Sequence, residues 1–431
     1  MNPRTTLRTL AFGLSMLVLV ATCAQAESIA KLSDDATISL LTLWPGNEIY
    51  IAFGHSALRV RDPKRNIDLI FNYGTFDFTD PLFIPKFVKG YLNYYLIYYP
   101  FREDLEYDKR TENRIWYEQI LNLDVHQANA LFDFLIDNAR PENRYYRYDF
   151  IMDNCATRIR DALLKALGPA VHFDPKNVQV PHKSYRQMIN EFVADRPFYR
   201  FMFYPVLGMA SDKQVTSFES QFLPLYMMKV FDASTIFKDG KEEPLVRSSE
   251  AIYSPSIVTD RGIRWANPEF IIWPCAVLAL FFTIRNFVNL RRNGLLPPRH
   301  ALFRLLDASL FCIVGLMGCL LFYLTAFSVH AAAKENLSVI WLLPTNLVAS
   351  FFLMQKKPIP EAISFYFVVV AALCVIPMVT WPIWPQRIDP KMIPLMVMIA
   401  ARAWWFYVAS QTTHHASKSK IPRTTGVTGG K

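Results

Sequence analysis

Cys155 is the residue of this 431-residue chain whose type and surroundings best suit covalent chemistry. The other five cysteines lie in apolar segments, so the six do not form the spacing pattern of a disulfide framework. From Asp153 to Leu167 the apolar residues recur at helical spacing, and Asp153 or Asn154 is a suitable N-cap. Cys155 is therefore expected in the first turn of a helix, where the helix dipole lowers a thiol pKa and free N–H groups can hold an oxyanion.

A nucleophilic thiol needs a base, and His55 is the best candidate. His126, His172 and His182 lie in polar segments without strand character, whereas His55 follows Gly54 at the head of a clear strand. A cysteine at a helix N-terminus facing a histidine on a sheet is the arrangement of papain-like thiol chemistry. A buried inert cysteine and a surface histidine remain the alternative interpretation of this pair.

The elements that must position these two residues are strands followed by helices. Period-two patterning between residues 38 and 73 predicts strands at 49–53, 56–61 and 67–73, with a turn at 61–66. Helical spacing follows at 115–138 and again at 153–167. We therefore expect an α+β domain built on an antiparallel sheet, over residues 27–265.

Both ends of the chain carry membrane signals. Two arginines, an apolar stretch at 10–20 and Ala24-Gln25-Ala26 predict a cleaved signal peptide over residues 1–26, with an uncleaved anchor or lipidation at Cys23 as alternatives. Five apolar segments near 268–288, 308–330, 336–355, 362–386 and 392–410 are each close to the ~20 residues that span a bilayer as a helix. They predict a helical membrane domain at 266–410 with about five transmembrane helices, followed by a basic cytoplasmic tail at 411–431.

The charge distribution indicates topology. Residues 27–264 carry 29 Lys/Arg and 32 Asp/Glu, whereas the rest of the chain carries 17 and 5. This basic surplus lies beside the apolar segments. By the positive-inside rule it places the more basic loops and the tail in the cytoplasm, and it does not indicate nucleic-acid binding. Residues 27–265 then face outward.

Arg402 falls within the fifth segment beside Trp404, Trp405 and Tyr407, and is expected to snorkel to the interface. No HExxH or CxxC spacing indicates a metal site.

Four blocks of sequence together resemble the periplasmic domain of the Lnb-type bacterial lipoprotein N-acyltransferases. They are Gly54-His55-Ser56-Ala57-Leu58-Arg59-Val60, Phe71-Asn72-Tyr73-Gly74-Thr75-Phe76-Asp77-Phe78, Pro141-Glu142-Asn143-Arg144-Tyr145 and Asp153-Asn154-Cys155-Ala156-Thr157-Arg158-Ile159-Arg160-Asp161. The resemblance covers about residues 38–165, with a weaker block at 207–212. The membrane portion resembles the family only in layout.

The resemblance implies a circularly permuted papain-like fold, similar to NlpC and lecithin:retinol acyltransferase relatives, with Cys155 as nucleophile and His55 as base. Asn72 is the candidate that orients the histidine, although the sequence does not single it out from Tyr73 or Asp77, and a plain cross-strand hydrogen bond is an equal alternative. Asn154 is similar to the residue before the cysteine in those relatives and is a candidate substrate-binding residue.

The activity implied is transfer of an acyl chain from a phospholipid, through a Cys155 thioester, to the N-terminal amine of a diacylglyceryl lipoprotein. Such an enzyme needs no cofactor and would lie in the bacterial inner membrane with its catalytic domain in the periplasm. The segment 81–101 is rich in aromatic residues with two lysines, and its Tyr91 and Tyr95 are candidates to bind lipid at the membrane interface or in an acyl groove. An ordinary aromatic core segment is the alternative.

Two other functions fit the same residues. A membrane-anchored papain-like cysteine hydrolase acting on peptidoglycan or peptides would use Cys155 and His55 with water as the acceptor. A non-catalytic membrane scaffold would keep the thiol for structure alone. Five apolar segments favour a lipid substrate, because one anchor would suffice for a cell-wall enzyme.

Overall fold

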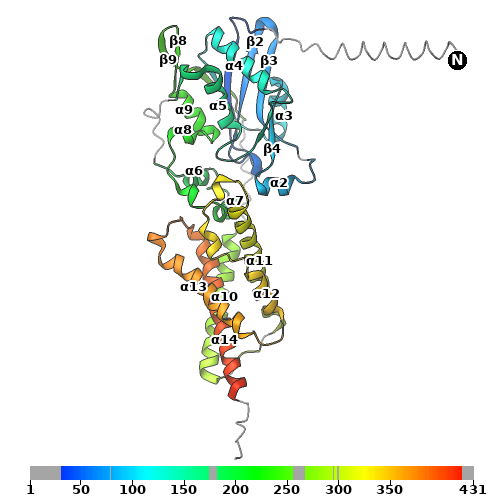
Figure 1. The fold of residues 1–431 in the computed structure, drawn as a ribbon, viewed down its shortest axis with the longest axis vertical. Helices are drawn as coiled ribbons and strands as arrows, with labels where there is room; N and C mark the ends of the chain where they lie inside the picture. Colours follow the sequence, from blue (N-terminus) through cyan, green and yellow to red (C-terminus); the bar gives the residue numbers. More distant parts are fainter. Residues whose placement is uncertain are drawn as a thin grey trace, which may run out of the picture.

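The computed structural model describes residues 31–77, 79–173, 182–255, 267–294, 296–298 and 300–419. The predicted signal peptide and the last part of the basic tail lie outside these residues. Within them, an N-terminal domain of antiparallel sheet and helices is followed by a bundle of long helices, which confirms the predicted fold class in outline. Figure 1 shows the sheet domain standing at one end of the elongated helical bundle.

The main sheet has seven antiparallel strands in the order β10-β5-β1-β2-β3-β4-β6. The strands are β1 Thr37–Leu43, β2 His55–Asp62, β3 Ile67–Thr75, β4 Asn93–Pro100, β5 Trp116–Leu121, β6 Tyr145–Arg147 and β10 Val246–Tyr253. The predicted meander at 56–73 is confirmed as β2 and β3. Asp62 accepts hydrogen bonds from the backbone of the turn between them, and Asn66 ends that turn with φ 54°.

Helices cover both faces of this sheet, which explains why its central strands are almost continuously buried. On one face Leu40, Leu58 and Phe71 pack in the same cluster as residues of α4 (Val125–Asn138) and α5 (Cys155–Leu167). On the other face Ala57 and Ile70 pack with residues from the α3 side (Phe101–Thr111). Because side chains alternate along a strand, these two clusters assign each residue of β2 and β3 to a face.

Two sequence predictions in this domain are wrong. Residues 116–121 form β5 and not the start of a helix, because they pair with β1 and β10 inside the sheet, and α4 begins only at Val125. Residues 49–51 form a 3₁₀ turn and not a strand. Gly54, with φ +81°, then turns the chain into β2.

Smaller elements complete the sheet domain. They are α2 Phe83–Lys89, α6 Tyr185–Phe192, α7 Pro197–Phe203, α8 Ser217–Ser220 and α9 Pro224–Asp232, with a second sheet of β7 Val171–His172, β8 Thr235–Lys238 and β9 Lys241–Pro244. In Figure 1, α2 and α7 lie at the edge that meets the helical bundle, and β8 and β9 lie at the opposite edge.

The helical bundle consists of α10 Glu269–Asn293, α11 Ala301–Ala326, α12 Asn346–Met354, α13 Glu361–Val379 and α14 Ile393–Ser419. Among the described residues, four stretches are long and apolar enough to span a membrane: 269–293, 301–326, 361–379 and 390–414. Four of the five predicted spans are therefore single long helices. Helix α14 also continues beyond the expected end at residue 410.

The third predicted span is broken because Pro344 interrupts it, and only the nine residues of α12 are α-helical. The segment still runs the length of the bundle. At one end the backbone N–H of Leu337 donates to Gln386 Oε1 at 2.6 Å, in the loop before α14. At the other end Ser410 Oγ, near the end of α14, donates to Ile359 O at 3.2 Å. Irregular backbone at membrane depth is tolerated where it packs against protein, as here against α11.

Arg402 is the other correction in the membrane region. Its side chain does not snorkel but is 7% exposed, and its guanidinium bonds both carboxylate oxygens of Asp307 on α11 at 2.7 Å. A third bond of 3.1 Å reaches Thr283 on α10. One ion pair therefore ties three helices together within the bundle.

Candidate active site

The candidate site is built around the N-terminus of α5, where the sequence places Cys155. Asn154 is the N-cap: its side-chain oxygen accepts the N–H groups of Ala156 and Thr157, and its amide donates to Phe150 O at 2.7 Å and Phe222 O at 2.9 Å. These four bonds use the whole hydrogen-bonding capacity of the amide. In this structure Asn154 fixes the turn that carries the cysteine, and its role in binding substrate stays a prediction.

The sulfur of Cys155 occupies a gap where β2 and β3 separate. The last paired residues of these strands are Leu58 and Phe71, so continued pairing would place Ser56 opposite Tyr73. Instead, the Ser56 N–H points to the Cys155 sulfur, and Tyr73 O accepts a hydrogen bond from the Tyr146 hydroxyl. The half-buried thiol thus lies beside the peptide that joins Ser56 to His55.

His55 and Asn72 are in contact across the same gap. The imidazole Nε2 lies 3.0 Å from Asn72 Oδ1, which also accepts the Gly74 N–H at 2.7 Å, while Asn72 Nδ2 donates to the Tyr99 hydroxyl at 3.3 Å. Because Oδ1 can only accept, His55 must donate through Nε2. The lone pair therefore resides on Nδ1, which is the atom able to receive a proton.

Gly74 provides the room for this ring. A Cβ at position 74 would lie 2.5 Å from His55 Cε1 and 3.1 Å from Asn72 Oδ1. A side chain there would displace the imidazole or the amide that holds it. The absence of a side chain at residue 74 is thus a requirement of the His55 position.

Cys155 and His55 approach the gap from different faces of the sheet. His55 and Asn72 stand two positions from Ala57 and Ile70, which places them on the α3 face, whereas α5 covers the other face. The sulfur nevertheless reaches the backbone next to His55 at the open end of β2. No hydrogen bond joins the sulfur to the imidazole among the bonds of the described residues, so proton transfer between them requires closer approach, as is common before substrate binds.

The electrostatics of the pair differ from the expectation of a thiolate. Burial raises the pKa of the Cys155 thiol, and the N–H groups of Ser56, Ala156 and Cys155 oppose this effect without reversing it. Burial, and next the positive charge of Arg114, lower the pKa of His55 to about 4. The predicted low thiol pKa is therefore wrong, and the resting pair is a neutral thiol and a neutral imidazole.

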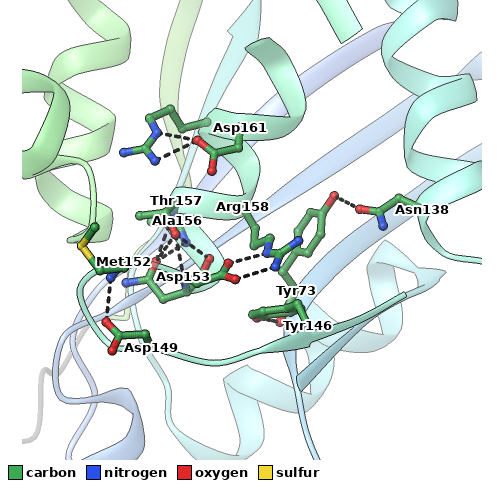
Figure 2. Close-up of polar contacts among 12 residues, drawn as sticks. Tyr73, Asn138, Tyr146, Asp149, Met152, Asp153, Ala156, Thr157, Arg158 and Asp161 are labelled. Carbon is green, nitrogen blue, oxygen red and sulfur yellow. Dashed lines mark hydrogen bonds and ion pairs between the residues drawn. The ribbon is translucent and has the colours of Figure 1, made fainter. Parts of the chain in front are cut away.

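The turn before Cys155 is held from both domains, as Figure 2 shows in part. Asp149 accepts the N–H groups of Ile151 and Met152 through one oxygen and the N–H of Ala331, beyond the end of α11, at 3.0 Å through the other. On the first turn of α5, Arg158 pairs with Asp153. The bundle thus contacts directly the segment that leads to the thiol.

The two tyrosines predicted to bind lipid lie away from the sulfur. Tyr95 is on the opposite face of β4 from Tyr94 and packs against Tyr145. Tyr91 is 39% exposed at the edge of the domain, with Arg147 over its ring at 4.2 Å. Neither tyrosine lines the gap that holds Cys155.

Three other tyrosines, missed by the sequence reasoning, surround the sulfur. Burial, followed by proximity to Cys155, raises the pKa of the Tyr94 and Tyr146 hydroxyls, and Cys155 also contributes to the raised pKa of Tyr148. The alternation of β4 predicts that Tyr94 and Tyr95 face opposite ways, but it does not say which one faces the helix that carries the thiol.

A cavity of about 370 Å³ beside α5 is lined by Asp153, Arg158, Asp161 and Lys165 among others, and neither Cys155 nor His55 lines it. Across the described ranges, no group of three or more His, Cys, Asp and Glu side chains could hold a metal ion.

Comparison with known families agrees with this two-part architecture. The family model for the Lnb N-terminal periplasmic domain matches residues 29–191, and that for the Lnb transmembrane domain matches residues 264–414. No curated protein and no solved structure matches the chain.

Proposed function

Because this chain belongs to the Lnb family, we propose that it is a membrane-bound acyltransferase that moves a fatty acyl chain from a phospholipid to the N-terminal amine of diacylglyceryl lipoproteins. The chain is a membrane protein with a periplasmic portion, and the bacterial inner membrane is the location proposed here. The observation that carries the proposal is the gap between β2 and β3, where a helix-terminal thiol lies beside the backbone N–H of Ser56, and the preceding residue, His55, has its ring oriented by an amide.

The first half-reaction would form a thioester on Cys155. As the sulfur attacks the ester carbonyl carbon, the thiol proton passes to His55 Nδ1, and the Cys155 N–H receives the developing oxyanion. Collapse of the intermediate breaks the bond to the glycerol oxygen. The imidazolium then gives the proton to that oxygen, and the lysolipid leaves.

The second half-reaction would transfer the acyl group to nitrogen. The α-amine of the lipoprotein attacks the thioester carbonyl, the carbon–sulfur bond breaks, and His55 carries the amine proton to the sulfur. An α-amine has a pKa near 8, so a useful fraction is neutral and nucleophilic at neutral pH. Asn72 would keep Nε2 occupied, so that Nδ1 is the nitrogen used in both steps.

The test is mass spectrometry of the intact protein after incubation with phospholipid in nanodiscs. We expect an acyl adduct on the Cys155 peptide that hydroxylamine removes, and its transfer to a diacylated lipopeptide added afterwards. Cys155→Ala should abolish the adduct, whereas Cys275→Ser, which changes an exposed cysteine of α10, should retain it. Gly74→Ala should slow adduct formation on the order of 100-fold, because it displaces the imidazole while leaving the sulfur in place.

Other outcomes would replace the proposal. Hydrolysis of muropeptides or peptides without any N-acylated product would indicate a cysteine hydrolase that uses the same pair. A Cys155→Ala protein that supports lipoprotein maturation as well as the parent chain would indicate a scaffold with a structural thiol.

A further inference from the structure

A continuous row of aromatic rings leads from α2 to the neighbourhood of Cys155. Phe87 stacks on Phe83 with centroids 6.3 Å apart, and Phe83 stacks on Phe76 at 5.6 Å. Phe76 contacts Tyr94 at 4.7 Å, and Tyr94 stacks on Tyr148 at 4.3 Å. The inner end of this aromatic row packs in the same apolar cluster as Cys155.

The outer end of the row is fixed to the end of a membrane-spanning helix. His330 and Val329 follow α11, and the His330 Nε2 donates to Phe87 O at 2.7 Å. The Val329 N–H donates to Lys89 O at 3.1 Å. The C-terminal end of α2 therefore lies beside the segment that follows α11, and Figure 1 shows α2 at the edge of the sheet domain that meets the bundle.

The N-terminal end of the same helix, where Leu82 is the N-cap, exposes apolar side chains. Leu82 is 55% exposed and Ile84 is 65% exposed. Nearby, the guanidinium of Arg147 lies 4.2 Å from the Tyr91 ring centroid, and the Lys89 ammonium lies 4.9 Å from it. Exposed apolar groups beside cations, continuous with a membrane domain, match the acyl and phosphate parts of a phospholipid.

We propose that the aromatic row is the track along which one acyl chain of an outer-leaflet phospholipid reaches Cys155. Leu82 and Ile84 form its mouth, and Phe83, Phe76 and Tyr94 line its course. This inference rests on the proposed function for its purpose, since it supplies the acyl donor of that reaction. Half-buried rings such as Phe76 and Phe83 can rotate to admit an acyl chain with a small loss of packing free energy, because each ring keeps aromatic neighbours on the row.

Photo-crosslinking in Cys155→Ala protein tests the track without requiring catalysis. The protein would be placed in nanodiscs with a phosphatidylcholine that carries a diazirine near the carboxyl end of one acyl chain, irradiated, and mapped by peptide mass spectrometry. We expect label on Phe76, Tyr94 or Tyr148. Label confined to the spanning helices and to Leu82 and Ile84 would overturn the track, because those residues meet bulk lipid.

An exposed substitution at the mouth provides a second arm that should not affect folding. Ile84→Asp should lower labelling of Phe76 and Tyr94 at least ~10-fold, because a carboxylate is costly to place among acyl chains. Phe237→Asp is the matched control, because Phe237 is 49% exposed on β8 at the far edge of the domain. Equal labelling of the two variants, with equal thermal stability, would exclude α2 as the point of entry.

The outcomes separate this inference from the proposed function. Label along the row in Cys155→Ala protein, combined with no thioester on the parent chain, would keep the track and reject acyl transfer. Thioester formation at the parent rate in Ile84→Asp, with label only outside the row, would keep acyl transfer and reject the track.

Discussion

At the scale of single residues, the gap between β2 and β3 determines the chemistry of both side chains. The N–H groups that point to the Cys155 sulfur would stabilise a thiolate, but burial outweighs them and raises the thiol pKa. The same burial, with Arg114, lowers the pKa of His55. Arg114 is held in place by Asp108, at 2.7 Å from Nε. The cysteine should therefore react by losing its proton to the histidine during attack, and not from a preformed ion pair.

The pH profile of thioester formation follows from these two shifts. A base with a lowered pKa stays unprotonated as the pH falls, so the rate should be flat from about pH 8 down to about pH 5 and should decline with an apparent pKa near 4. An unperturbed histidine would give a decline near 6.5. The measurement is the adduct rate between pH 3.5 and 9 in nanodiscs. A decline near 6.5, or alkylation of Cys155 that has reached its plateau by pH 7, would contradict the neutral pair.

At the scale of elements, a polar contact fixes the packing of apolar helices. Arg402 on α14, Asp307 on α11 and Thr283 on α10 are joined by three hydrogen bonds in a region where lipid offers no alternative partner. An apolar stripe gives no unique register between helices in a membrane, because lipid tails are as apolar as the side chains. The ion pair supplies that register.

Removal of one partner should therefore destabilise the bundle strongly. Arg402→Met leaves the Asp307 carboxylate buried and unpaired, at an expected loss of about 3–5 kcal/mol in the free energy of unfolding. The double variant Arg402→Met/Asp307→Leu should recover most of this loss. Thermal unfolding in detergent, with Arg387→Met in the exposed loop before α14 as control, measures both effects. A single variant as stable as the control would show that the pair is dispensable.

At the scale of the whole molecule, hydrogen bonds of backbone and side-chain groups in a few loops join the two domains. Gly208 donates its N–H to Ala332 O at 2.8 Å, and Asp149 accepts the Ala331 N–H at the turn that precedes Cys155. Arg186 holds the Gly208 side of this contact by donating to the carbonyls of Leu207 and Gly208. The membrane domain is thus in direct contact with the turn that precedes Cys155.

Gly208→Ala should uncouple the domains. Its Cβ would lie 1.9 Å from Lys334 O, so the loop after α11 must move and Ala331 must leave Asp149. We expect faster hydrogen exchange of residues 149–154 and slower thioester formation, with the sheet itself unchanged. Gly240→Ala is the control for local strain, because its φ of +74° disfavours a side chain in the β8–β9 turn, while a Cβ there meets nothing within 4 Å and so displaces no other segment. Unchanged exchange at 149–154 in Gly208→Ala would mean that the membrane domain does not hold the turn.

The sequence by itself determined the features that depend on neighbouring residues. Asn154 and Thr157 form the capping box that starts α5, so the position of Cys155 in the first turn was predictable. The alternation of β2 and β3, the order of the two domains and the family resemblance were also evident. Asn72 could be proposed as the partner of His55, although only the structure distinguished it from Tyr73 and Asp77.

Only the tertiary structure decided the features that depend on residues far apart in the chain. The direction of the Cys155 pKa shift is set by burial among Tyr94, Tyr146 and Tyr148, and helix position alone suggested the opposite sign. The partner of Arg402 is likewise settled by packing against α11, which carries Asp307. Desolvation and pairing are properties of the space around a side chain, and local patterns of residue type carry no information about which distant segments fill that space.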